Sequence, residues 1–212
     1  MPENLAAEGT AETRRTGGMG AYGAQSTVFG WLERAATPEL KARLRLYRLG
    51  TLTLPEPLPK GQGRIANEED REQLILWLRE FDVSVGSAPS ADAVADVGAG
   101  DDPRLASKRF VLWETPDGIP ASMAGMTPVV AGQVRVDPVY TPAGLRGRGY
   151  AGAVTAEVSR VALAASATEV VLFTDLDNPT SNALYQRIGY RPVTDFASYD
   201  FSQAVTGDVF VR

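Results

Sequence analysis

The spacing of apolar residues changes along the chain, and each change predicts a different element. In RLRLYRLGTLTL, the pairs Leu44 and Leu46, then Leu52 and Leu54, are two residues apart, which favours a strand. Residues 37–39 (Thr-Pro-Glu) carry a helix-start signal with proline where its missing N–H has no cost. We therefore expect a helix that turns into a strand in this region.

A second region predicts a short strand followed by a longer helix. The strand is RIAN, and the helix covers NEEDREQLILWLREF, residues 67–81. Asn67 can cap the first turn, where three acidic residues complement the helix N-terminus. The buried face is expected to hold the apolar residues at helical spacing, Leu74, Ile75, Trp77, Leu78 and Phe81.

The second half of the chain contains strands of both kinds. KRFVLWE, IPASMAGMTPVV and QVRVDPVYT are strand-like runs joined by short breaks, which predicts an antiparallel meander. A helix AGAVTAEVSRVALAAS, a strand TEVVLFTD and a helix ending at Gly189 follow, and YRPV and ASYDFS are two terminal strands. The strand, helix, strand, helix order demands a partly parallel central sheet flanked by helices, an α/β (α+β) fold.

Composition shifts divide the chain. The first residues have few large apolar side chains to offset the entropy of ordering, and PEPLPKGQG is a stiff connector. The small, acidic stretch 86–103 is expected to be a long mobile loop or a loose helical excursion. The expected order is a disordered tail (1–25), an appendage that begins with a short helix (26–54), the connector (55–63), the main domain (64–203) and a C-terminal tail (204–212).

Composition narrows the chemistry. The 212 residues include no cysteine and no histidine, which excludes disulfides, thiolate or imidazole metal sites and histidine bases. A net charge of −5 disfavours general binding to nucleic acid or anionic membrane. No apolar run reaches the roughly 18 residues of a membrane span, and the N-terminus has no signal pattern. We expect no metal, no nucleic acid, no membrane and a cytoplasmic location.

The loop RGRGYA, residues 146–151, stands between a strand pattern and a helix pattern. Several backbone N–H groups would converge there at a helix N-terminus, with the positive end of its dipole. Glycine at 147 and 149 lets the backbone turn and approach an anion. The loop spells neither a Walker loop nor a dinucleotide fingerprint, so it predicts a phosphate cradle of another kind.

Two motifs at this spacing resemble the GNAT superfamily of N-acetyltransferases. The first is the form RxxGxA at Arg146, Gly149 and Ala151, preceded by the strand residues VYT, and the second is DNPTSNALYQRIGYRPV. The resemblance covers roughly residues 64–202 and is specific over 133–194, and it implies a GNAT-like fold with acetyl-CoA as co-substrate. Residues 1–55 lie outside it and fit a remnant of a second, degenerate domain of the same type.

The resemblance also implies residue roles. Main-chain groups of Val139, Tyr140 and Thr141 would meet the pantetheine arm and the acetyl carbonyl, whose developing oxyanion needs a donor. Asn178 would contact pantetheine, with Asn182 as a second candidate, although Asn178 equally suits a helix cap. The diphosphate would lie on the loop residues Arg146, Gly147, Arg148, Gly149, Tyr150 and Ala151.

Tyr185 matches the position where many family members keep a tyrosine near the CoA sulfur, and its implied role is general acid. Its alternative role is aromatic packing between helix and sheet. The acceptor amine must lose a proton, and the candidates to receive it are Glu114, at the end of FVLWE, and Asp137 in VRVDPVY. Either carboxylate also suits a solvated strand end or turn.

The function expected from this sequence is direct acetyl transfer from acetyl-CoA to a primary amine of a small molecule or protein. Because the amine itself attacks in a ternary complex, no protein nucleophile is needed. The alternative is a catalytically silent acyl-CoA-binding module. An RNA-binding protein that uses RGRG is disfavoured by the net acidity. The apolar segment 26–54 fits either a homodimer contact or a packed appendage.

Overall fold

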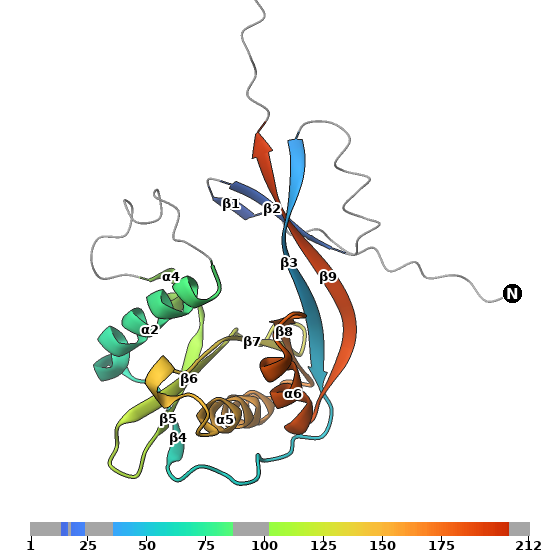
Figure 1. Ribbon diagram of the computed structural model, residues 1–212. Coiled ribbons are helices and arrows are strands. Elements are labelled where there is room, and N and C mark those ends of the chain that lie inside the picture. Colours follow the sequence, from blue (N-terminus) through green and yellow to red (C-terminus); the bar gives the residue numbers. More distant parts are fainter. Residues whose placement is uncertain (1–13, 17, 24–35, 87–101, 204–212) are drawn as a thin grey trace, which may run out of the picture.

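The computed structural model describes residues 14–16, 18–23, 36–86 and 102–203, and Figure 1 shows their arrangement. The described strands form one nine-stranded sheet in the order β1-β2-β9-β3-β8-β7-β6-β5-β4. Neighbouring strands are antiparallel except for β7 and β8, which are parallel. The strands are β1 (Arg14–Thr16), β2 (Gly18–Gly23), β3 (Ala36–Leu49), β4 (Gln62–Ile65), β5 (Arg109–Glu114), β6 (Pro120–Met126), β7 (Gln133–Tyr140), β8 (Glu169–Asp175) and β9 (Tyr190–Gln203). The mixed, partly parallel sheet is therefore confirmed.

The helices lie against this sheet. The first begins in the short η1 (Glu68–Asp70), where Asn67 accepts from the Glu69 amide and Asp70 accepts from the Asn67 amide in a capping box. The predicted cap at Asn67 is thus confirmed. The remaining helical elements are α2 (Arg71–Ser84), α4 (Pro103–Ser107), η2 (Ala143–Leu145), α5 (Tyr150–Ala164) and α6 (Pro179–Arg187).

The alternation along β5 divides the core into two layers. Phe110 and Leu112 pack with Leu74 and Trp77 of α2 on one face of the sheet. The intervening residues of β5 pack on the other face in a larger cluster with residues of α5 and α6. Of the apolar α2 residues expected inside, Leu74, Trp77 and Leu78 are buried, whereas Ile75 and Phe81 are half-buried.

The N-terminal region differs from its prediction. Residues 36–49 form one long strand with no helix at 37–39, and the strand ends at Leu49, so residues 50–54 are not part of it. β3 lies between β8 and β9 and pairs with both, inside the sheet of the domain from which the sequence interpretation had separated it. The physical reason is that β8 would otherwise offer an open edge on that side, and β3 satisfies its backbone groups.

Two further predictions differ from the structure, and three others fall mostly or wholly outside the described residues. Part of the expected disordered tail forms the strands β1 and β2, and β2 pairs with β9. YRPV and ASYDFS belong to one continuous strand, β9. The short helix expected from Ser26 lies mostly outside the described residues, as do most of the expected loop 86–103 and the whole of 204–212.

Candidate active site in the opening between two parallel strands

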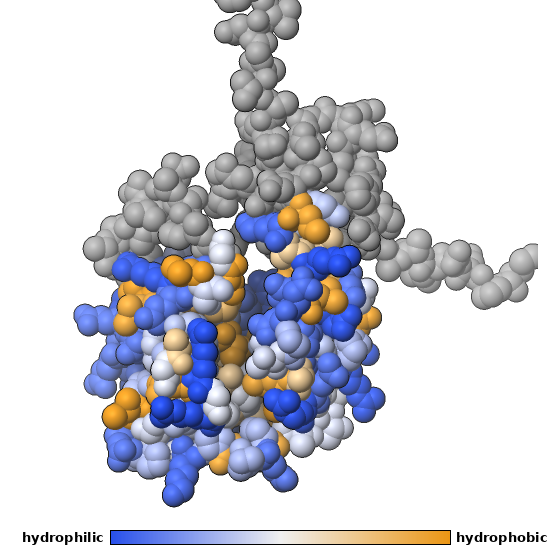
Figure 2. Space-filling model, viewed as in Figure 1, coloured by the Kyte–Doolittle hydropathy of each residue, from blue (hydrophilic) through white to orange (hydrophobic). Residues whose placement is uncertain are grey.

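The parallel pair β7 and β8 opens part-way along its length. Its register runs from Gln133 with Glu169 to Arg135 with Val171 and is recorded no further among the described residues. Beyond this point β7 pairs with β6 and β8 pairs with β3. The two strands therefore diverge, and Figure 2 shows a hollow between the two sides of the molecule.

A bulge in β7 lies where the opening begins. Met126 of β6 faces Val136 and Ala124 faces Val139, so two residues of β7, Asp137 and Pro138, oppose the single residue Gly125. A Cβ on Gly125 would lie 2.7 Å from the Asp137 carbonyl oxygen, so the bulge requires glycine on the facing strand. The bulge thereby re-aims the residues that border the opening.

The loop after β7 carries a row of unpaired amides. α5 begins at Tyr150 after Gly149, and its first intrahelical bond runs from the Ala153 amide to the Gly149 carbonyl. Within the described part of the chain, no hydrogen bond is recorded for the main-chain N–H groups of residues 147–152. They form a run of six consecutive donors at a helix N-terminus, which is suited to an anion.

Backbone geometry explains the glycines of this loop. Gly147 and Gly149 have φ of 75° and 84°, in the left-handed region that favours glycine. A Cβ at Gly147 would meet nothing within 4 Å, so the turn rather than lack of room requires glycine there. At Gly149 the nearest atom would be Pro59 at 3.6 Å, so the proline-rich connector packs beside the loop. The neighbouring arginine side chains are exposed.

The end of β7 presents its main chain to the opening. The Tyr140 carbonyl accepts from the Ser122 hydroxyl at 2.8 Å and so faces β6. Because successive strand residues direct their amide and carbonyl groups to opposite edges, Val139 directs its own toward β8. Thr141 accepts from Arg146 Nε through its carbonyl at 3.0 Å. Val139 is the best placed of the three predicted strand residues to meet a ligand with its backbone.

The Tyr140 side chain packs in the core layer between the sheet and α2. Its hydroxyl donates to Glu80 of α2 at 2.8 Å, and its ring lies 6.3 Å from the ring of Trp77. Burial and the nearby Glu80 carboxylate raise the pKa of Tyr140 above its usual value. This tyrosine therefore remains neutral and ties β7 to α2.

Tyr185 is buried in α6 beside the opening. Its ring lies 6.4 Å from Tyr47 and 6.1 Å from Tyr190. Burial raises the pKa of Tyr185 well above its usual value, and electrostatic interactions with Tyr190 and Asp137 raise it further. No described residue is hydrogen-bonded to the Tyr185 hydroxyl, which leaves it able to donate to a ligand.

The two asparagines of this region have internal partners. Asn178 caps α6 by accepting from the Ser181 amide at 3.0 Å, as the alternative interpretation held. Asn182 is buried, donates to the carbonyls of Asp175 and Asn178, and accepts from the Tyr47 hydroxyl at 2.8 Å. The Asn182 carboxamide is thus occupied in holding α6 to the end of β8 and to β3.

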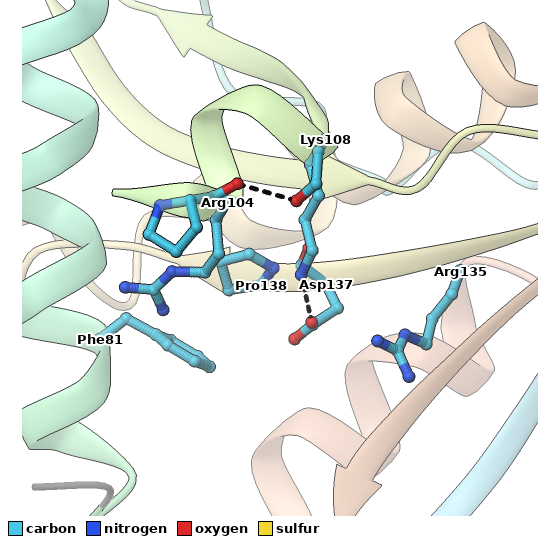
Figure 3. Close-up of a pocket in the computed structure, with 8 residues that line it drawn as sticks. Phe81, Arg104, Lys108, Arg135, Asp137 and Pro138 are labelled. Atoms are coloured by element: carbon cyan, nitrogen blue, oxygen red, sulfur yellow. Dashed lines mark hydrogen bonds and ion pairs between the residues drawn. The ribbon is translucent and has the colours of Figure 1, made fainter. Parts of the chain in front are cut away.

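A cavity of about 210 Å³ lies on the α2 and α4 side of the sheet (Figure 3). Lys108 Nζ donates to the Asp137 carboxylate at 2.5 Å and to the Asp137 carbonyl at 2.9 Å. Figure 3 shows Asp137 in the middle of the group, between Phe81 and Arg135. The cavity is lined by Phe81, Pro103, Arg104, Ser107, Lys108, Arg135, Asp137 and Pro138.

The two candidate bases lie in different surroundings. Glu114 is 7% exposed and accepts from Arg64 Nε at 2.7 Å, and Arg64 also holds Asp70 through two hydrogen bonds of 2.6 and 2.7 Å. Glu114 lies on β5, two strands away from β7, and does not line the cavity. Asp137 lines the cavity and has a side chain 43% exposed. Of the two, Asp137 is the carboxylate that the fold brings to the opening.

Sequence reasoning did not single out Arg104, Lys108 or Arg135. These three residues meet only because α2 and α4 pack against β7. The sequence around each of them does not indicate this packing. Tyr47 was missed because its partner Asn182 is 135 positions away. Among the described residues no cluster of acidic side chains could hold a metal ion, and no described helix is long and apolar enough to cross a membrane.

The fold and one segment of the sequence match known proteins. The family model described as FR47-like protein matches residues 134–198, from β7 through most of β9. No curated protein matches the chain. Among solved structures, a GCN5-related N-acetyltransferase from Kribbella flavida has a TM-score of 0.58 and 20% identity over 86% of this chain and 66% of its own. The chain has the fold of the GNAT acetyltransferases.

Two more solved GNAT structures are similar in fold to this chain. A GNAT-family protein from Novosphingobium aromaticivorans has a TM-score of 0.57 and 18% identity, covering 81% of this chain and 68% of its own. A GCN5-related N-acetyltransferase from Sphaerobacter thermophilus has a TM-score of 0.56 and 18% identity, covering 86% and 59%. The chain thus spans about two thirds or less of the length of these GNAT proteins. At these identities the likeness shows the GNAT fold.

Proposed function

We propose that this chain is an acetyl-CoA-dependent N-acetyltransferase that acts on a primary amine. The observation that carries the proposal is the row of unpaired amides over residues 147–152, at a helix N-terminus beside diverging parallel strands. Six such donors form a site for a diphosphate, the group that links the two parts of coenzyme A. The exposed guanidinium groups of Arg146 and Arg148 add positive charge nearby.

The opening between β7 and β8 would hold the rest of the cofactor. With the diphosphate on the loop, the pantetheine arm runs along β7, where the main chain of Val139 faces the opening. The thioester then reaches the bulge at Asp137 and Pro138, and Tyr185 packs in the same core cluster as Val136 and Val139 of β7. A backbone donor at this point would stabilise the oxyanion that develops on the acetyl oxygen.

The transfer step balances without a protein nucleophile. The amine nitrogen attacks the acetyl carbonyl carbon, a C–N bond forms, and the C–S bond breaks to release CoA. The amine loses one proton, which passes to the Asp137 carboxylate directly or through water. The sulfur takes up one proton, for which Tyr185 is the nearby donor, since its raised pKa keeps the phenol protonated at neutral pH.

The binding step can be tested directly. Acetyl-CoA should raise the melting temperature of the purified protein, as any ligand specific for the folded state does. Gly149→Val should weaken this binding about 10- to 100-fold, the range expected for losing one charge-assisted hydrogen bond, because φ at this position is 84°. Gly144→Val is the matched control, since a Cβ there meets open space. Equal affinity in both variants would remove the main support for the cradle.

The transfer step needs a second measurement. Free thiol should appear when acetyl-CoA and a panel of primary amines are mixed with the protein, at rates that depend on the amine. Stabilisation by acetyl-CoA without amine-dependent thiol release would instead support the silent acyl-CoA-binding module.

A further inference from the structure

The cations of the cavity differ in their partners. Arg104 forms ion pairs with Asp82 and with Asp102, at 2.8 and 2.6 Å. Lys108 forms its ion pair with Asp137. The Arg135 guanidinium has no recorded hydrogen bond or ion pair with any described residue, although it lines the same cavity. Arg135 is therefore the cation of this cavity whose charge is available to a ligand.

The backbone of Arg135 is firmly held even though its side chain has no partner. Its amide donates to the Thr127 hydroxyl at 2.9 Å, and its carbonyl accepts from the Thr127 amide at 3.0 Å. On the other edge Arg135 pairs with Val171, the last recorded pair before β7 and β8 diverge. The guanidinium thus projects from a rigid strand at the base of the opening.

Asp137 supplies the opposite charge two residues further along β7. Successive residues of a strand face opposite sides, so Arg135 and Asp137 share a face with their Cα atoms about 7 Å apart. Lys108, whose side chain is 10% exposed, binds Oδ2 of Asp137, and no described residue is bonded to Oδ1. Asp137 and Arg135 line the same cavity, and Figure 3 shows their side chains next to each other along β7.

This pair of charges suits a ligand that carries both signs. An ammonium group is attracted to the free oxygen of Asp137, and a carboxylate matches the planar fork of a guanidinium. A second cationic group on the ligand would be repelled by Arg135. The volume of about 210 Å³ is below the range of roughly 300–1,000 Å³ usual for drug-sized ligands, so the occupant is small.

We infer that the acceptor is a small amino acid, whose amine lies beside Asp137 and whose carboxylate is held by Arg135. The inference rests on the proposed acetyltransferase function and assigns its substrate class. The bound ammonium first loses one proton to water. The neutral amine then forms the new C–N bond and gives a second proton to Asp137, the thioester C–S bond breaks, and the sulfur takes up one proton, so the products are an N-acetyl amino acid and CoA. Arg135 stays outside the reacting atoms and determines specificity.

The test compares free amino acids with their primary amides, which keep the amine and lose the negative charge. For the native protein, kcat/KM should be about 10- to 100-fold higher for the acid of each pair, the range expected for one charge-assisted hydrogen bond. Arg135→Ala should abolish this preference, and Arg135→Glu should invert it. Arg160→Ala is the matched control, because Arg160 is exposed on α5 over the other face of the sheet.

The outcomes separate this inference from the proposed function. Equal kcat/KM for acids and amides, or a preference that survives Arg135→Ala, would overturn the amino acid assignment while transfer itself still proceeded. Acetyl-CoA binding without transfer to any amine would instead overturn the acetyltransferase function. The melting temperature of each variant with acetyl-CoA confirms that the fold and the cradle are intact.

Discussion

On one side of the opening, β4 to β7 follow one another along the chain and pair as neighbours. On the other side, β8 pairs with β3, and β3 pairs with β9, so the sheet alternates between segments from the two ends of the chain. The first half is a local meander between α2 and α5, whereas the second half exists only once distant segments have met. The opening between β7 and β8 lies between a half built locally (the local half) and a half built by long-range pairing (the long-range half).

The two halves also contribute differently to the site. The local half supplies Asp137, Arg135 and the amide row through β7 and the loop that follows it. The long-range half supplies Tyr185, which is held by neighbours from β3 and β9 through Tyr47 and Tyr190. We therefore expect loss of the buried residues that hold α6 in the long-range half to act first on stability, and substitution of the β7 residues that border the opening to act first on turnover.

The largest effect is expected from Tyr47→Ala. Tyr47 is fully buried, donates to Asn182 and accepts from Gln186, so its removal leaves a cavity and unpaired groups on α6. The free energy of unfolding should fall by about 3–5 kcal/mol, measured by urea denaturation. Arg48→Ala, at the exposed next position, should change it by less than about 0.5 kcal/mol. Equal stability of the two variants would contradict the placement of β3.

The two carboxylates form the next comparison. Asp137→Asn should lower kcat by about 100-fold, in the range for losing a general base. Glu114→Gln should leave kcat nearly unchanged and lower stability by about 1–2 kcal/mol, because Glu114 is a buried partner of Arg64. Steady-state kinetics measures kcat of both variants, and urea denaturation measures their free energy of unfolding. A larger loss of kcat in Glu114→Gln would restore Glu114 as the base.

A smaller effect is expected from removing one hydroxyl group. Tyr185→Phe keeps the ring that packs on Tyr47 and Tyr190 and should lower kcat about 10-fold through the lost donor, with acetyl-CoA affinity unchanged. Tyr190→Phe removes the hydroxyl that contacts Ser159 and should reduce stability without affecting kcat. Undiminished kcat in Tyr185→Phe would assign this tyrosine to packing alone.

The smallest expected effect is on the pH dependence of stability, through Asp70 in the local half. The ion pair and hydrogen bonds with Arg64 hold the pKa of Asp70 below its usual 3.8. The ionised Asp70 carboxylate therefore stabilises the folded protein fully above about pH 4, and this stabilisation is lost as the pH falls through the folded-state pKa. Asp70→Asn should lower the free energy of unfolding by about 1 kcal/mol at pH 7, the net scale of one hydrogen bond, and by less at pH 3. A difference that did not shrink on acidification would exclude this pair as its source.

The elements of the local half could be predicted from sequence because their signals are local. The capping box at Asn67, the helical spacing of Leu74 and Trp77, and the three strand runs of the meander each depend on neighbouring residues. The glycine loop could be predicted in the same way, because Gly147 and Gly149 themselves permit the positive φ angles that the turn needs. These residues therefore led to the mixed sheet and to the glycine loop that precedes α5.

The place of residues 36–49 could not be predicted, because a strand pattern shows that a segment pairs and does not show with what. Its partners lie in β8 and β9, at the other end of the chain. The choice between Asn178 as a cap and as a ligand contact, and the positions of Glu114 and Asp137, likewise depended on packing between elements.

The sequence by itself determined the kinds of most elements, the glycine loop before α5 and the absence of cysteine and histidine from the chemistry. Tertiary structure decided which strand lies beside β8, which carboxylate borders the opening, and that Arg135 lines the cavity without an ion partner. The physical reason is the distance along the sequence between the residues that determine each feature. Helix caps, turns and apolar periods are settled within a few residues, whereas strand partners and charge pairs depend on backbone groups and side chains that meet only after the chain has folded.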